Sequence, residues 1–157
     1  MKIKINHFFI TILLLNVSCG FKVLDKSKNN NFSIQEVRSS GEIRINHKIK
    51  NNILRNSKET SENQVVLTLN TKKIKSIKEK NIKNEVTKYQ ISLQSNIEFF
   101  LIRGNVKSNF NKSVVGDYIA GANYSTTINN EKKIIDDLIE NLSEKILDEI
   151  VLKLNDL

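Results

Sequence analysis

The side chains of this sequence that could do chemistry gather in two places. The single cysteine, Cys19, directly follows an apolar run near the start of the chain, and its thiol can be alkylated once deprotonated. Further along, six lysines crowd one short segment, at Lys72, Lys73, Lys75, Lys78, Lys80 and Lys83. Ammonium groups at this density attract phosphates and other anions. The sequence therefore offers one position for covalent modification and one for anion binding.

The residue sets of common enzyme and metal sites are missing from the sequence. Beyond the first 18 residues the only histidine is His47, and a lone histidine is more often a surface residue than a catalytic base. No CxxC, HExxH or GxSxG pattern occurs, and the five glycines form no phosphate-binding loop. The dense acidic residues near the C-terminus are typical of a solvated helix face. We therefore expect no enzymatic activity, no metal and no cofactor.

Residues 1–18 have the composition of a bacterial export signal. Two lysines and no acid precede the apolar run Phe8–Leu15, and small residues stand directly before Cys19. The run is too short to cross a bilayer as a helix, which takes roughly 20 apolar residues. An N-terminal membrane anchor, or a buried strand with an incidental cysteine, is the alternative interpretation. The pattern favours export with removal of residues 1–18.

Lipidation would account for the cysteine. One cysteine cannot form an internal disulfide, so an exported chain needs another use for it. The run LNVSC resembles the lipobox of bacterial lipoproteins. That resemblance implies a thioether-linked diacylglyceride on Cys19, whose several acyl chains give stable membrane anchoring. By the same resemblance, Gly20 in place of Asp favours sorting to an outer membrane over retention at the inner one. We expect a signal peptide over residues 1–18 and an acylated tether over residues 19–31.

The chain as a whole is basic, with a net charge of +8. Such a balance is compatible with lipid phosphate or nucleic acid as a partner. Few aromatic residues lie among the clustered lysines, so the stacking surface of a single-strand nucleic-acid binder is missing. The sequence is also crowded with Lys, Asn and Ile and has no Pro, which can reflect the genome rather than a partner. The lysine segment is therefore either a phosphate-facing surface or a solvated loop.

Alternation of apolar and polar residues predicts the strands. They are Phe32–Val37, Gln64–Asn70, one long strand from about Val86 to Leu101, and Val106–Phe110. If the flanking strands extend into the Lys-rich segment Thr71–Glu85, its lysines line the tip of a β-hairpin. Arg103-Gly104-Asn105 is a turn, and Val114–Tyr124 reads as a strand end followed by an irregular connection.

Two segments have apolar residues at helical spacing. The first runs from about Glu42 to Asn56, with Ile45, Ile49 and Ile53 on one face. Ser39 and Glu42 match a capping box before it. The second is Ile128–Leu154, with Thr126 or Thr127 as the expected N-cap. The order β-α-β-β-β-α predicts an α+β fold: an antiparallel-rich sheet of about four strands with two α-helices packed on one face. Residues 32–157 are expected to form a single domain.

With these elements placed, the chain resembles the lipopolysaccharide-assembly lipoproteins of the LptE family, in their alphaproteobacterial form. The resemblance rests on CGFKVL directly after the signal, the early strand and helix, the strand KYQISLQ, and SVVGDYIAGANYSTT before the last amphipathic helix. It implies a non-enzymatic lipoprotein at the periplasmic face of the outer membrane. Such a protein plugs the LptD β-barrel translocon, assists its assembly and helps deliver lipopolysaccharide to the outer leaflet.

The same resemblance implies that the lysine segment binds lipopolysaccharide. The candidate contacts with lipopolysaccharide phosphates are Lys72, Lys73, Lys75, Lys78, Lys80 and Lys83. The acidic face of the last helix would then meet polar barrel wall or periplasm. Two other classes of protein stay open. One is an outer-membrane structural or adaptor lipoprotein without lipopolysaccharide contact. The other is a soluble secreted binder that uses Cys19 as an ordinary thiol.

Replacing Cys19 with Ala tests the anchor. We expect a soluble, unacylated periplasmic form, because no later segment has an apolar run long enough for a bilayer. Cell fractionation and the mass of the native N-terminus measure the outcome. A Cys19→Ala protein that stays in the membrane fraction without its barrel partner would contradict lipid anchoring.

Overall fold

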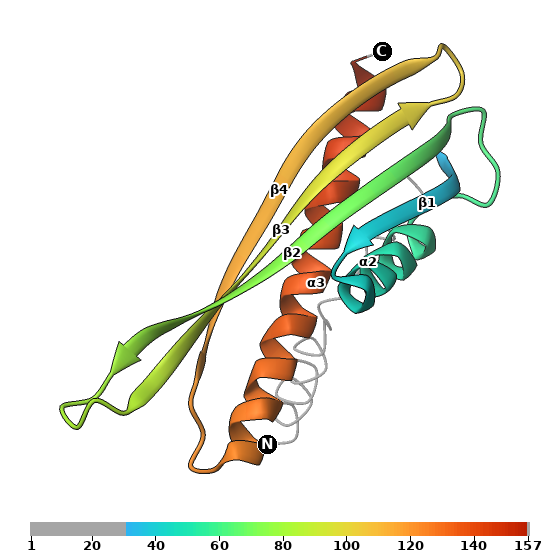
Figure 1. Ribbon diagram of the computed structural model, residues 1–157. Coiled ribbons are helices and arrows are strands. Elements are labelled where there is room, and N and C mark those ends of the chain that lie inside the picture. Colours follow the sequence, from blue (N-terminus) through green and yellow to red (C-terminus); the bar gives the residue numbers. More distant parts are fainter. Residues whose placement is uncertain (1–30, 157) are drawn as a thin grey trace, which may run out of the picture.

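The computed structural model describes residues 31–156, so the predicted signal peptide, Cys19 and most of the predicted tether lie outside the described residues. In chain order the elements are β1 (Ser33–Gly41), α2 (Ile43–Arg55), β2 (Gln64–Lys80), β3 (Val86–Leu101), β4 (Val106–Ile119) and α3 (Tyr124–Asn155). The predicted element order is confirmed, including the bounds of the long strand β3 (Figure 1).

The four strands form one sheet in the order β1-β2-β3-β4. β1 runs parallel to β2, because α2 connects the two strands as a crossover. The β2–β3 and β3–β4 pairs are antiparallel. Both helices lie on the same side of the sheet, with α3 running along much of its length (Figure 1). The predicted fold class, an antiparallel-rich α+β sheet with two helices, is confirmed.

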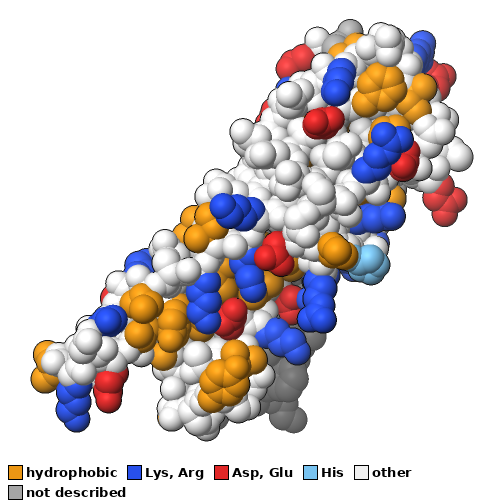
Figure 2. Space-filling model, in the orientation of Figure 1, with side chains coloured by type: hydrophobic (Ala, Val, Ile, Leu, Met, Phe, Trp, Pro, Cys, Tyr) orange, Lys and Arg blue, Asp and Glu red, His pale blue; other side chains and the backbone are white. Residues whose placement is uncertain are grey.

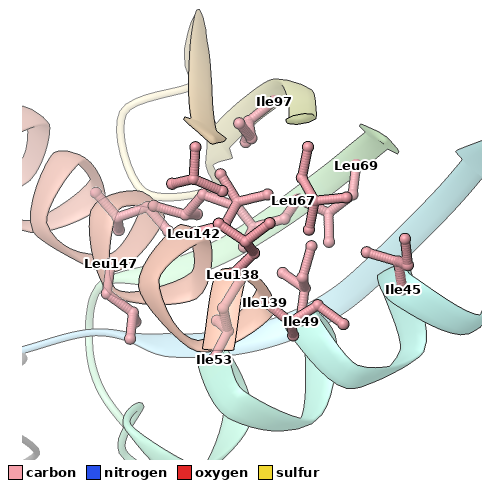
Figure 3. Close-up of a cluster of buried hydrophobic side chains, with 14 of the residues drawn as sticks. Ile45, Ile49, Ile53, Leu67, Leu69, Ile97, Leu138, Ile139, Leu142 and Leu147 are labelled. Atoms are coloured by element: carbon pink, nitrogen blue, oxygen red, sulfur yellow. The ribbon is translucent and has the colours of Figure 1, made fainter. Parts of the chain in front are cut away.

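The core lies between the helices and the sheet. β2 alternates as predicted, with Val65, Leu67 and Leu69 fully buried. The isoleucine stripe of α2 packs against this face of the sheet, and α3 adds a second stripe (Figure 3). The α3 residues of the core are Leu138, Ile139, Leu142, Ile146, Leu147 and Ile150. The apolar periodicity of both helices therefore predicts their buried faces correctly.

A bulge keeps β1 in register with this core. Ile34 pairs with Val65, but the next pairing joins Glu36 to Val66. The extra residue on β1 returns Val37 to the face that Ile34 occupies. Both side chains are half-buried against the core.

The predicted capping box before α2 is wrong. Ser39 and Ser40 belong to β1, where they pair with β2, and the strand continues to Gly41. Gly41 has a φ of +82°, and a Cβ there would lie 2.3 Å from the carbonyl oxygen of Thr71. Glu42 caps α2 by position only, since its side chain makes no capping hydrogen bond. Its backbone N–H donates to Thr71 instead, so strand pairing overrides the local signal.

The predicted end of the sheet is also too short. β4 continues without a break to Ile119, where an irregular segment was expected. Gly116 permits this path, because a Cβ there would lie 2.9 Å from the Ile134 side chain of α3. The expected threonine N-cap is wrong as well. The cap of α3 is Asn123, whose side-chain oxygen accepts from the Thr126 N–H at 2.8 Å.

The packing predicts unequal costs of truncation along α3. Leu142→Ala and Ile146→Ala each remove a fully buried side chain and should cost roughly 2–5 kcal/mol of unfolding free energy. Asp137→Ala and Asp148→Ala, at exposed positions of the same helix, should cost about 0.5 kcal/mol or less. Urea unfolding followed by circular dichroism measures the difference. Equal losses in the two pairs would contradict this packing.

Candidate functional site

The β2–β3 hairpin carries the lysine segment out to one end of the molecule. We call residues 72–90 the arm: the second half of β2, the connecting turn and the start of β3. The turn is organised by Asn81, whose side-chain oxygen accepts from the backbone N–H groups of Lys83 and Glu85 at 2.9 and 3.0 Å. The hairpin extends past the end of β4 (Figure 1). The lysines therefore do line a hairpin, as the extended-strand interpretation expects.

Strand alternation assigns three of the six lysines to one face of the sheet or the other. Lys73 and Lys75 continue the row of buried Leu69 and Thr71, and so face the helices. Lys72 lies on the open face of the sheet, in the row of Asn70. The pairing of β2 with β3 shifts register after Ile77. Lys78 and Lys80 lie in this irregular end of β2, and Lys83 lies in the turn that follows.

On the inner face, one carboxylate collects donors from two strands. Glu131 of α3 accepts from Lys75 Nζ at 2.6 Å and from the Tyr118 hydroxyl at 2.8 Å, both at Oε2. Lys73 Nζ lies 4.0 Å from its other oxygen. The Lys75 ammonium also sits 4.5 Å from the ring centre of Tyr89, which stacks on Tyr118 with ring centres 5.2 Å apart. This inner cluster of five residues ties β2 and β4 to α3.

The inner cluster shifts the pKa values of Glu131 and Lys75 toward ionisation. Partial burial alone would raise the pKa of Glu131, but hydrogen bonds from Lys75 and Tyr118 outweigh it and hold that pKa below its ordinary value. Burial likewise opposes the charge of Lys75, yet its bonds to Glu131 and Tyr118 raise its pKa to about 12. Lys75 and Glu131 therefore remain a charged pair across the neutral range.

On the open face of the sheet and at the tip of the arm, the lysines differ in their partners. Lys78 forms an ion pair with Asp117 of β4. Hydrogen bonds from Lys78 and Gln90 hold the pKa of Asp117 below its ordinary value. Lys80 donates to the Asn84 side-chain oxygen at 2.9 Å. Lys72 and Lys83 form no ion pair with any residue between 31 and 156. Lys72, Lys80 and Lys83 are thus the exposed cations of the segment without an acidic partner there.

Exposed apolar side chains accompany these cations. Ile74 and Ile77 lie on the arm at 38% and 54% exposure, and Ile82 in the turn is fully exposed. Val115 and Ile119 of the adjoining β4 are more than half exposed. Hydrophobic and basic side chains lie next to one another over the lower part of the molecule (Figure 2). Exposed apolar patches commonly mark interaction sites, and this composition suits a ligand that is both anionic and apolar.

Sequence reasoning missed the acids that neutralise half of the segment. Glu131 and Asp117 lie 56 and 39 residues from the lysines that they bind, so neither is visible as a neighbour in the sequence. Within the Lys-rich segment itself the only acids are Glu79 and Glu85. Counting an uninterrupted hairpin register back from the Arg103-Gly104-Asn105 turn, with Leu101 opposite Val106, sets Asp117 opposite Gln90 and could have placed one acid beside the arm.

The remaining candidates add no second site. His47 is exposed, and its ring lies 3.4 Å from the Asn51 amide. Among residues 31–156, no group of three His, Cys, Asp or Glu side chains could hold a metal ion. Neither helix of this range is long and apolar enough to cross a membrane.

The inner cluster predicts a pH-dependent coupling between Lys75 and Glu131. A double-mutant cycle with Lys75→Gln and Glu131→Gln should give about 1 kcal/mol or less at pH 7, since Lys75 is partly exposed. Because the pKa of Glu131 is lowered in the fold, this stabilisation is complete above its ordinary value of 4.5 and is lost as the pH falls through the folded-state value. Urea unfolding of the four proteins from pH 7 downward measures it. A coupling that stays constant into the acid range would contradict the pairing.

Comparison with known proteins places the fold. No protein-family model and no curated protein matches the sequence. Among solved structures, rare lipoprotein B from Shewanella oneidensis is similar over 81% of this chain and 98% of that chain, with a TM-score of 0.63 and 16% identity. The uncharacterized lipoprotein B from Nitrosomonas europaea is similar over 80% of this chain and 86% of that chain, with a TM-score of 0.55 and 11% identity. The chain therefore has the fold of the rare lipoprotein B structures, and the resemblance to LptE-type lipoproteins is confirmed at the level of the fold.

Proposed function

We propose that the chain is an outer-membrane lipoprotein of the lipopolysaccharide transport machinery, anchored through Cys19 at the periplasmic face. It plugs an LptD-like β-barrel, assists its assembly and helps pass lipopolysaccharide to the outer leaflet, without enzymatic activity. Two independent lines support this: the export signal that ends at Cys19, and the rare lipoprotein B fold of residues 31–156. The observation that supports lipopolysaccharide as the ligand is the arm, where lysines without an acidic partner and exposed isoleucines share one hairpin.

The arm matches the chemistry of lipopolysaccharide. Lipid A presents phosphates beside acyl chains, so a protein surface that binds it must offer cations next to apolar groups. Lys72, Lys80 and Lys83 supply ammonium groups that no acid among the described residues neutralises. A lysine binds phosphate as a point charge and without fixed geometry. Several weak contacts of this kind suit a ligand that must be released to the next step.

The open face of the sheet suits the interior of a hydrated barrel. Asn70, Asn96 and Asn111 form one exposed row across β2, β3 and β4. The next row holds Lys72, Gln94 and Ser113. Exposed amides and hydroxyls can exchange hydrogen bonds with a polar wall directly or through water. This face therefore supports the plug role without requiring an apolar interface.

A second function, an adaptor lipoprotein without lipopolysaccharide contact, has one observation in its favour. Lys73, Lys75 and Lys78 already have acidic partners within the fold. If the whole segment serves only to tie the hairpin to β4 and α3, no external anion is needed. The two functions differ in whether the remaining lysines bind lipopolysaccharide.

Lipopolysaccharide binding by matched charge variants distinguishes them. Lys72→Gln, Lys80→Gln and Lys83→Gln together should weaken binding roughly tenfold, or about 1.4 kcal/mol, with little change in unfolding stability. A control with Lys50→Gln, Lys58→Gln and Lys107→Gln removes the same charge away from the arm and should bind as the parent does. Binding by the parent should also fall as salt rises, because the Debye length shrinks from about 10 Å at 0.1 M to about 3 Å at 1 M. Equal affinity of the arm variant and the parent would overturn lipopolysaccharide contact at the arm.

A further inference from the structure

The position that the Glu131 carboxylate occupies in the inner cluster resembles an anion-binding site. Lys75 and the Tyr118 hydroxyl converge on one oxygen of Glu131 at 2.6 and 2.8 Å, with Lys73 at 4.0 Å from the other oxygen. The Glu131 side chain is only 15% exposed. Two ammonium groups and a phenol around one anion form the donor set that would equally bind a phosphate.

The donors are held in place by contacts that do not involve Glu131. Lys75 Nζ lies over the stacked rings of Tyr89 and Tyr118, at 4.5 and 5.4 Å from their centres. Cation–π contacts of this geometry orient an ammonium group independently of a counter-ion. Lys73 and Lys75 are also fixed by the β2–β3 ladder, where they pair with Leu93 and Ile91. The donor set would therefore persist if the carboxylate moved away.

Glu131 comes from a different element than its donors. It is the only acidic residue in the first twelve residues of α3, between Tyr124 and Ile135. All three donors belong to the sheet, on β2 and β4. The carboxylate is thus presented by the helix to a cationic surface of the sheet, as a ligand would be.

We propose that Glu131 is an internal competitor, occupying with its carboxylate a site on the inner face of the arm that a phosphate group can take. The inference rests on the proposed function in that the natural phosphate would be carried by the same ligand. With Glu131 in place, the two lysines and the carboxylate leave a net charge of about +1, and a phosphate ester must displace the carboxylate to reach its donors. Displacement would free Glu131 and remove an ion pair that ties the arm to α3. Anion binding and detachment of the arm from the helix are then one event.

Inorganic pyrophosphate is the probe, with the detergent-solubilised full lipoprotein measured by isothermal titration at low salt. Glu131→Gln keeps the shape of the side chain and removes its charge, and should bind pyrophosphate roughly tenfold tighter than the parent. Asp136→Asn is the matched control, because it removes the same charge from the same helix, where the carboxylate pairs with Lys48. Its affinity should equal that of the parent. Adding Lys75→Gln to Glu131→Gln should abolish the gain.

Two results would overturn the inference: Glu131→Gln binding no tighter than Asp136→Asn, or a gain that survives Lys75→Gln. A measurement on the parent covers the case in which Glu131→Gln fails to fold. Saturating pyrophosphate should shift the NMR signals of the Tyr118 and Tyr89 rings, whereas signals confined to the tip of the arm would contradict an inner site. Failure of the proposed function gives a different result, because replacing Lys72, Lys80 and Lys83 would then leave the affinity for lipopolysaccharide unchanged. A parent that binds lipopolysaccharide through these lysines, with no gain in Glu131→Gln, overturns the inner site alone.

Discussion

The continuous pairing of β2 with β3 is the constraint on which the rest of the structure depends. The ladder runs from Val65 opposite Leu101 to Lys80 opposite Val86. At one end its inner face is fully apolar and forms the floor of the core beneath α2 and α3. At the other end the same two strands leave the core and carry charge. One hairpin therefore joins the core of the molecule to the arm, and its strand alternation sets the face on which Lys72, Lys73 and Lys75 appear.

The charged end of the ladder is stabilised by elements that arrive late in the chain. β4 brings Asp117 and Tyr118 alongside the arm, and α3 brings Glu131. Each neutralises or orients a lysine that would otherwise repel its neighbours. Lys73 and Lys75 face the helices and pair with Glu131, and Lys78 pairs with Asp117, while Lys72 and Lys83 have no acidic partner among the described residues. Strand alternation, together with the acids that β4 and α3 bring, explains how a dense lysine segment can be partly structural and partly exposed.

Local periodicity predicts the elements of this fold well, and long-range partners explain where it fails. The alternation from Val86 to Leu101 gives β3 its correct bounds, because one face of that strand is buried for most of its length. The capping box at Ser39 fails because pairing with β2 satisfies the backbone there, which no local pattern reveals. Gly116 looks like a break in a strand, yet it is the place where α3 lies against β4. The position of the arm follows from the sequence. The acids that pair with its lysines, Asp117 and Glu131, are far away in the sequence, and only the fold brings them near.

Our central proposal is that this protein works inside a lipopolysaccharide translocon. The most direct test is purification of the tagged full chain from the membranes of its native cells, with mass spectrometry of the intact complex. We expect an LptD-like β-barrel in a stable complex with this chain, and loss of barrel assembly when the chain is depleted. Recovery of the chain alone or with other partners, together with normal barrel assembly on depletion, would contradict it.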